Sequence, residues 1–234
     1  VSYLLPQSNK NILKQLLSIS IPVSLTTAIM ILGSNIDSIT IVRILKNNIG
    51  EVEARKVYGI ITSKVNLIVG LPLALNGAVS VSLIPEISRN IIKNNRKKLK
   101  RNIKYLLLIT LIISVPVTMV VLLFSKNVML LLYPNAPKGA ELLKIASLGI
   151  LFSCLTQNMS GILQGTGDSK THFYAVFVGM IFKFILNIIL IPNESILEKG
   201  AVISTISSNF VIFLIMFLKT LKTLKHLKTR EKLA

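Results

Sequence analysis

Two uninterrupted apolar runs constrain this sequence more than any other feature. Leu106–Leu123 contains no charged residue, and Ala175–Ile191 contains only Lys183. A helix of about 20 residues crosses the ~30 Å hydrocarbon core of a bilayer, so each run is close to the length of one membrane span. Only 15% of the residues are charged, whereas soluble domains carry about 25%. The sequence therefore predicts an all-α integral membrane protein.

The alternation of apolar runs with polar loops predicts a bundle of six membrane helices. Their expected ranges are 14–42, 57–86, 103–124, 139–165, 171–192 and 198–220. The first, second and fourth are longer than a span requires, so we expect them to tilt, bend or extend beyond the bilayer. Prolines inside the first three helices remove backbone hydrogen bonds and predict kinks at Pro22, Pro72 and Pro116.

The basic residues are distributed unevenly between the loops, and this predicts an orientation. The linker after the second helix and the tail are rich in Lys and Arg, and such segments of membrane proteins stay in the cytoplasm. Both termini are then inside, and the formal net charge of +18 reflects topology, not nucleic-acid binding. The expected outer loops are 43–56, 125–138 and 193–197. The expected layout is a cytoplasmic lead-in over 1–13, a six-helix membrane lobe over 14–220 and a basic cytoplasmic tail over 221–234.

The cytoplasmic segment 87–104 combines positive charge with an apolar face. Ile92, Leu99, Ile103 and Leu106 recur at helical spacing among cationic residues. Two interpretations remain open: this face can lie on anionic inner-leaflet lipids, or the segment can be a solvated basic loop. The tail repeats the pattern with Leu218, Leu221, Leu224 and Leu227.

The stretch GTGDSK superficially resembles a nucleotide-binding loop. A Walker A loop has glycine immediately before its lysine, but Ser169 occupies that position here. A strand should also precede such a loop, and a membrane helix is expected instead. We predict a turn in which Gly165 and Gly167 end one helix and Asp168 or Ser169 caps the next.

The sequence contains no evident catalytic or metal-ligating constellation. His172 and His226 are far apart, and neither has ligand-like spacing with Cys154, the single cysteine. We therefore expect no enzymatic activity, cofactor or metal site, unless the chemistry lies in a part of the protein outside this sequence.

Polar residues inside the apolar helices are the strongest functional candidates. Lys183 lies near the middle of the fifth helix, with Asn187 one turn later on the same face. An ionisable side chain at this depth is costly unless it faces a partner or a hydrated cavity. We favour a cavity, against a structural lysine that binds a buried carbonyl or reaches one membrane surface.

Further candidates lie in the first and second helices. Lys64 and Asn66 occupy the outer half of the second helix, where a cavity role and simple snorkelling both remain open. Asp37 is the only acid well inside an apolar segment. It can pair with a helix lysine, coordinate a cation or carry a proton, and pairing is the simplest of these. A polar stripe on the fourth helix is expected to hydrogen-bond between helices; it comprises Gln157, Asn158 and Gln164.

The order and spacing of these residues resemble one family of membrane transporters. The similarity is carried by PVSLTTAIMILGSNIDSITIVRIL, VYGIITSKVNLIVGLPLALNGAVSVSLIPEIS and GILQGTGDSK. They are similar to the second six-helix lobe of flippases in the multidrug/oligosaccharidyl-lipid/polysaccharide (MOP) exporter superfamily, within its stage V sporulation protein B type, which is related to polysaccharide biosynthesis exporters and the lipid II flippase. The resemblance covers residues 10–220 and implies one lobe of a two-lobed, MATE-like fold. The other lobe would come from a longer chain or a second copy, and the opening at Val1 without Met also indicates a piece of a longer product.

The resemblance further implies transport by alternating access in a bacterial cell membrane. The implied substrate is an undecaprenyl-diphosphate-linked sugar or peptidoglycan precursor for cell-envelope or spore-cortex synthesis. Its diphosphate would be held by basic cavity residues, here Lys64 and Lys183. Relatives that flip lipid II use cavity arginines, and the six helices as predicted contain none. Two alternatives remain: a drug or cation antiporter of the same superfamily, and a non-transporting membrane scaffold that recruits partners through its basic segments.

Overall fold

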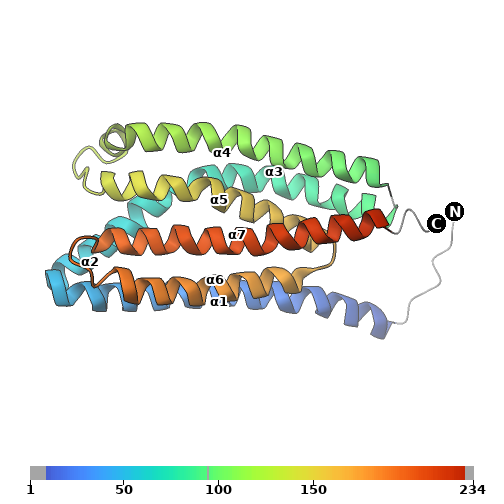
Figure 1. Ribbon diagram of the computed structural model, residues 1–234, viewed down its shortest axis with the longest axis horizontal. Coiled ribbons are helices and arrows are strands. Elements are labelled where there is room, and N and C mark those ends of the chain that lie inside the picture. The colour runs from blue at the N-terminus through green and yellow to red at the C-terminus, as the bar shows by residue number, and fades with distance from the viewer. Residues whose placement is uncertain (1–8, 94, 230–234) are drawn as a thin grey trace.

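The structure is a bundle of helices. The computed structural model describes residues 9–93 and 95–229, and within them every regular element is a helix. Six segments of this described part are long and apolar enough to cross a membrane, which confirms the predicted all-α fold with six membrane helices. The helices run side by side along one long axis, and both ends of the described chain lie at the same end of the bundle (Figure 1).

The helices follow one another with short connections. In chain order they are α1 (Asn9–Ile49), α2 (Glu51–Ile60), the π-helical turn η1 (Ile61–Val65), α3 (Asn66–Ile92), α4 (Arg96–Leu132), α5 (Ala140–Gly165), α6 (Ser169–Leu190) and α7 (Glu198–Thr229). The second membrane span is continuous through α2, η1 and α3. We call the end of the bundle where α1 turns into α2 the Gly50 end, and the opposite end, where α3 turns into α4, the Asn95 end.

The reversal between α1 and α2 takes a single residue. Gly50 has a φ of +81°, a left-handed conformation that favours glycine. Glu51, which follows it, binds Lys46 at 2.6 Å and Arg55 at 2.8 Å. All but Arg43 of the charged residues that predicted a loop over 43–56 pair with one another, and they lie on two helices. The prediction of a loop there is wrong, because residues 43–56 are helical apart from Gly50.

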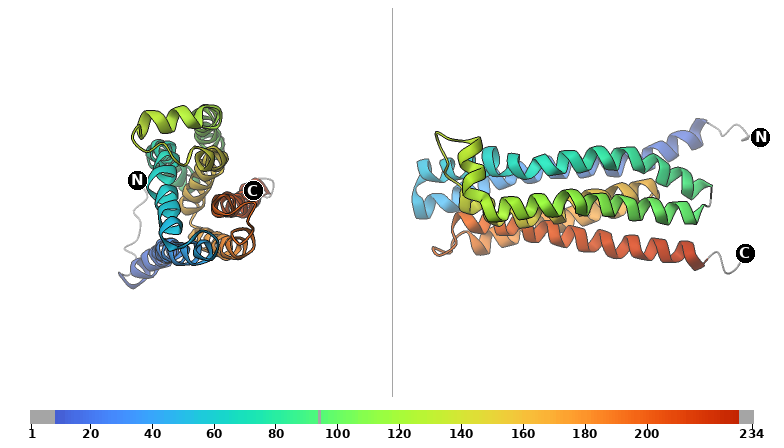
Figure 2. Two further views of the ribbon diagram at one scale, coloured as in Figure 1. Left: turned by 90° about the vertical axis from the view of Figure 1, so that its left-hand side faces the viewer. Right: turned by 90° about the horizontal axis from the view of Figure 1, so that it is seen from above.

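α4 also continues past its predicted end at residue 124. Phe124 has non-helical backbone angles, with φ −115° and ψ 26°, and the turns that follow it run across the long axis of the bundle (Figure 2). The prolines expected to kink the helices, Pro22, Pro72 and Pro116, all lie inside α-helices. The kinks at these prolines stay predictions, and the backbone deviation within α4 lies at Phe124.

The basic segment 87–104 is formed by the ends of two core helices. Asn95 caps α4 by accepting a hydrogen bond from the Lys98 amide at 3.2 Å. Leu99, Ile103 and Leu106 are buried in a cluster with Ile87, whereas Ile92 is exposed. Most of the apolar face therefore packs inside the protein and is not free to lie on a lipid surface. In the tail, Leu218 and Leu221 are exposed, and the side chains of Leu224 and Leu227 fall outside the described residues.

The GTGDSK turn has the predicted capping structure. Gly165 is the last residue of α5, and Gly167 has a φ of +82°. The amide of Asp168 donates to the Leu163 carbonyl at 2.8 Å, which closes the end of α5. The Asp168 carboxylate accepts from the Thr171 amide at 3.3 Å and caps α6. The prediction of a helix–turn–helix connection is confirmed.

A buried polar network separates two apolar clusters along the bundle. Asn76 of α3 donates to Gln157 of α5 at 2.7 Å, and Thr110 of α4 donates to Asn76 at 2.9 Å. Asn158 donates to Thr110 and accepts from Ser80. This confirms interhelical hydrogen bonding for Gln157 and Asn158. Because each group of the network has partners, α3, α4 and α5 are joined in one specific register.

Candidate functional site

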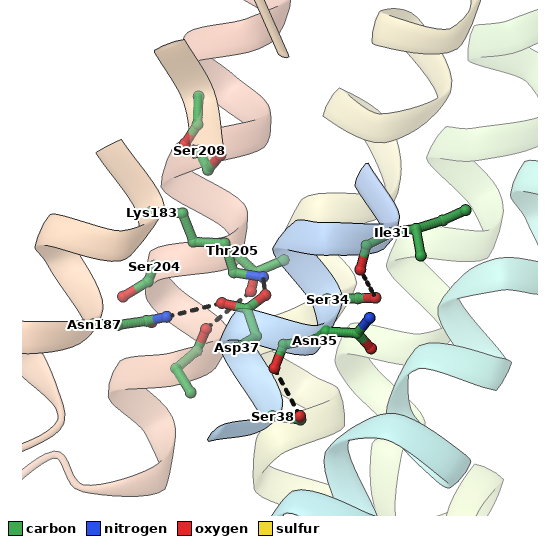
Figure 3. A network of polar contacts seen from close by, with 12 residues as sticks. Ile31, Ser34, Asn35, Asp37, Ser38, Lys183, Asn187, Ser204, Thr205 and Ser208 are labelled. Atoms are coloured by element: carbon green, nitrogen blue, oxygen red, sulfur yellow. Dashed lines mark hydrogen bonds and ion pairs between the residues drawn. The ribbon is translucent and has the colours of Figure 1, made fainter. Parts of the chain in front are cut away.

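An ion pair joins α1 to α6 near the middle of the bundle. The Lys183 ammonium donates to Oδ2 of Asp37, and the Asn187 amide donates to Oδ1 of the same carboxylate at 3.1 Å (Figure 3). Lys183 and Asn187 reach one carboxylate because residues four apart share a helix face. The two helices approach closely at Gly33, where an added Cβ would lie 3.0 Å from Sδ of Met180.

The members of this pair are largely withdrawn from solvent. The side chain of Asp37 is 16% exposed and that of Lys183 is 21% exposed, and Asn187 is fully buried. Among the described residues, Oδ1 of Asn187 has no hydrogen-bond partner. Pairing keeps both charges stable at this depth, since each neutralises the field of the other. Of the three interpretations of Asp37, the structure therefore shows pairing with a helix lysine.

Asp37 and Lys183 line a cavity of about 180 Å³. The cavity is enclosed by α1, α2, η1, α3, α5, α6 and α7, and its wall mixes apolar side chains with hydroxyl and amide groups. This volume holds several water molecules, which agrees with the hydrated surroundings predicted for Lys183. It is smaller than the 300–1,000 Å³ typical of pockets that enclose organic ligands, so a bulky headgroup does not fit inside the lobe.

The structure brings together some of the predicted site residues and separates one. Asn66 lines the same cavity as Asp37 and Lys183. The ammonium of Lys64 instead donates to the Ala136 carbonyl at 2.5 Å and lies 5.0 Å from the ring centroid of Tyr133. Lys64 therefore holds the α4–α5 connection and does not line the cavity.

Comparison with known proteins identifies the family. The MatE family model matches residues 22–189. The chain belongs to the MatE family. It is 26% identical over 206 residues to the uncharacterized membrane protein YabM of Bacillus subtilis (strain 168). The aligned region covers 86% of this chain and 37% of that protein. It is 27% identical over 157 residues to the lipid II flippase MurJ of the same organism. The aligned region covers 65% of this chain and 28% of that protein.

The fold of this MatE chain agrees with solved structures. It superposes on a crystal structure of MATE in the bent conformation with a TM-score of 0.82 at 17% identity, over 97% of this chain and 48% of that one. The chain thus spans about half of the solved transporter and little more than a third of YabM. The predicted lobe of a MATE-like fold is confirmed, as is the predicted multi-pass membrane class.

Several polar residues that line the cavity around Asp37 and Lys183 were not predicted from the sequence. They are Ser34, Tyr58, Ser153, Thr205 and Asn209. Asn209 donates to the Ser153 hydroxyl at 2.9 Å. The spacing of Ser34 three residues before Asp37, and of Thr205 four residues before Asn209, places each pair on one helix face. That spacing was a signal in the sequence, although single hydroxyls in apolar helices are too common to be specific.

The prediction that the membrane helices contain no arginine is wrong for the first helix. Arg43 was expected in a loop, but α1 extends to Ile49, and Arg43 lies within the first candidate membrane span, Ser20–Ile49.

Among the described residues, no group of three or more His, Cys, Asp or Glu side chains is arranged to hold a metal ion.

Proposed function

We propose that the protein is a transporter that moves a lipid-linked, phosphate-bearing precursor across the membrane by alternating access. The substrate class is an undecaprenyl-diphosphate-linked sugar or a lipid II-like peptidoglycan precursor used in envelope or spore-cortex synthesis. Membership of the MatE family and the similarity to a lipid II flippase support this proposal. The observation that carries it is a lysine within a candidate membrane helix, Lys183, on the wall of a partly polar cavity.

The physical argument rests on the cost of moving a diphosphate through hydrocarbon. An anionic headgroup cannot cross the bilayer core unaided, and a fixed cation in hydrated surroundings lowers its transfer free energy. Lys183 is neutralised by Asp37 in the present structure. A diphosphate would compete with this carboxylate for the ammonium, so substrate binding and the α1–α6 contact would be linked.

The proposed transporter needs a second lobe, because the cavity within this lobe is too small for the headgroup. The headgroup would be held between this lobe and another, supplied by a longer chain or by a second copy. Midplane sites between two structural repeats are common in transporters. We further propose that both termini of the chain face the cytoplasm, as the distribution of basic residues predicts.

A second candidate function is export of cationic drugs, favoured by the fold shared with MATE structures and by the Asp37 carboxylate. Asp37→Asn and Lys183→Ala separate the two. Lys183→Ala should abolish flipping of a fluorescent lipid-linked diphosphate in proteoliposomes, while Lys126→Ala, a change at an exposed lysine on α4, should leave it intact.

If cationic drugs are the substrate, Asp37→Asn should abolish ethidium efflux and Lys183→Ala should not. Flipping that survives Lys183→Ala contradicts the proposed role of this lysine. A scaffold without transport activity would show neither flux in any variant.

A further inference from the structure

A second hollow lies between α1 and α6, nearer the Gly50 end than the ion pair. It has a volume of about 420 Å³ and is lined by residues of both helices and by Pro192. Its apolar wall includes Ile39, Phe184 and Ile188, and its polar rim includes Thr40, Arg43 and Asn47. No acidic residue lines it. We call it the Arg43 groove.

The groove has a definite polarity along the bundle axis. α1 and α6 lie side by side along their length (Figure 1), and two contacts fix their register. Asp37 meets Lys183, and the Asn48 amide donates to the Pro192 carbonyl at 3.3 Å closer to the Gly50 end. The apolar residues next to Asp37 and Lys183 in sequence therefore lie deepest, and Arg43 lies more than a turn further toward the Gly50 end.

The charge of Arg43 is available to a ligand. Its side chain is exposed, and no ion pair between described residues includes it. Arg43 lies six residues before the end of α1 at Ile49, roughly 9 Å along the helix at 1.5 Å per residue. A guanidinium binds phosphate oxygens with two parallel N–H donors. The groove thus offers a phosphate-binding cation above an apolar channel.

We propose that the Arg43 groove binds an anionic phospholipid. The phosphodiester lies on the Arg43 guanidinium, with the Thr40 hydroxyl and the Asn47 amide as further donors, and one acyl chain follows Phe184 and Ile188 toward the membrane centre. The absence of an acidic residue from the lining favours a lipid of net negative charge over a zwitterionic one, whose own cation would be repelled by Arg43. This site is independent of the transport function proposed above.

The test is retention of lipid by the full purified protein, measured by native mass spectrometry in detergent with phosphatidylglycerol and phosphatidylcholine at equal concentration. Arg43→Gln should reduce phosphatidylglycerol retention about tenfold, as expected for the loss of one charge-assisted contact. Arg55→Gln is the matched control, since it removes the same charge at the same end but from an exposed residue paired with Glu51. Equal retention in these two variants overturns the proposal.

Three further measurements keep the result specific. Arg43→Lys should restore only part of the retention, because it returns the charge without the second parallel donor. An unchanged thermal unfolding midpoint in all three variants shows that the fold is intact. Inorganic phosphate at millimolar concentration should not displace the lipid. If phosphate alone displaces it, or if phosphatidylcholine is retained equally well, the groove is not an anionic-phospholipid site.

Discussion

Lys183 of α6 and Asp37 of α1, which are 146 residues apart in the sequence, form an ion pair between the two helices. Each charge of the pair is stabilised by the other, because either one alone would remain poorly solvated inside the bundle.

Replacing one partner of this pair should therefore destabilise the protein more than the pair itself stabilises it, because the other charge is left unpaired. Asp37→Ala or Lys183→Ala alone should destabilise the protein by about 3 kcal/mol, the lower part of the range for buried pairs, since both side chains keep some exposure. The double variant Asp37→Ala/Lys183→Ala should lose less stability than the two single losses added together. Unfolding in detergent followed by circular dichroism measures all three, and a double variant as unstable as the sum of the two would contradict the coupling.

Gly179 should be intolerant of a side chain. A Cβ at this position would lie 2.3 Å from Cγ1 of Ile212 on α7, so Gly179→Ala should destabilise the protein by about 1–3 kcal/mol through overpacking. Adding Ile212→Ala should make the combined loss smaller than the sum of the single losses. Gly70→Ala is the control, because nothing lies within 4 Å of its added Cβ and alanine favours the helix. Equal losses for Gly179→Ala and Gly70→Ala would exclude close α6–α7 contact.

Asp168 should make stability depend on pH in the acidic range. Partial burial would raise the pKa of this carboxyl, but the hydrogen bonds from Thr171 and the ion pair with Lys219 at 3.2 Å outweigh it and lower the pKa below its usual 3.8. A lowered folded-state pKa stabilises the fold above the unfolded-state pKa, and the stabilisation is lost as pH falls through the folded value.

The thermal midpoint of the wild type should thus fall between about pH 5 and pH 2 by more than that of Asp168→Asn. Asparagine keeps a side-chain oxygen that can cap α6 but cannot titrate. Parallel midpoints for the two proteins over this interval would show that Asp168 is not responsible.

The two ends of the bundle should lie on opposite sides of the membrane, with the Asn95 end in the cytoplasm. In a Cys154→Ser background, a cysteine introduced by Ser195→Cys should react with a membrane-impermeant thiol reagent on intact cells. Lys93→Cys should react only after permeabilisation. Both positions are exposed in the structure. The opposite labelling would reverse the predicted orientation.

Hydropathy predicted all six spans because an apolar run of this length has few other stable environments. It misplaced the helix ends because charged residues such as Lys46 and Glu51 normally indicate a loop, whereas here they lie in exposed helical turns on either side of Gly50. Helical spacing predicted that Lys183 and Asn187 share a face, but not that they meet Asp37, since the packing of α1 on α6 is a long-range property. The sequence left open whether Lys64 lines a cavity or snorkels, and it could not show the partners of this lysine, Ala136 and Tyr133, because they lie on a distant connection.

The π-helical turn η1 has a consequence for the second span. A π turn accommodates one more residue than an α turn, and one residue corresponds to about 100° of rotation around a helix axis. The five residues Ile61–Val65 therefore act as an inserted residue that sets the angular phase between α2 and α3. Tyr58, before the turn, and Asn66, after it, both line the cavity, and the extra residue gives these positions, eight apart in the sequence, about the phase of residues seven apart in a regular helix. Deleting one residue here would restore a regular helix and keep that phase, so both side chains should still face the cavity, whereas inserting one more residue would turn Asn66 by about 100° relative to Tyr58.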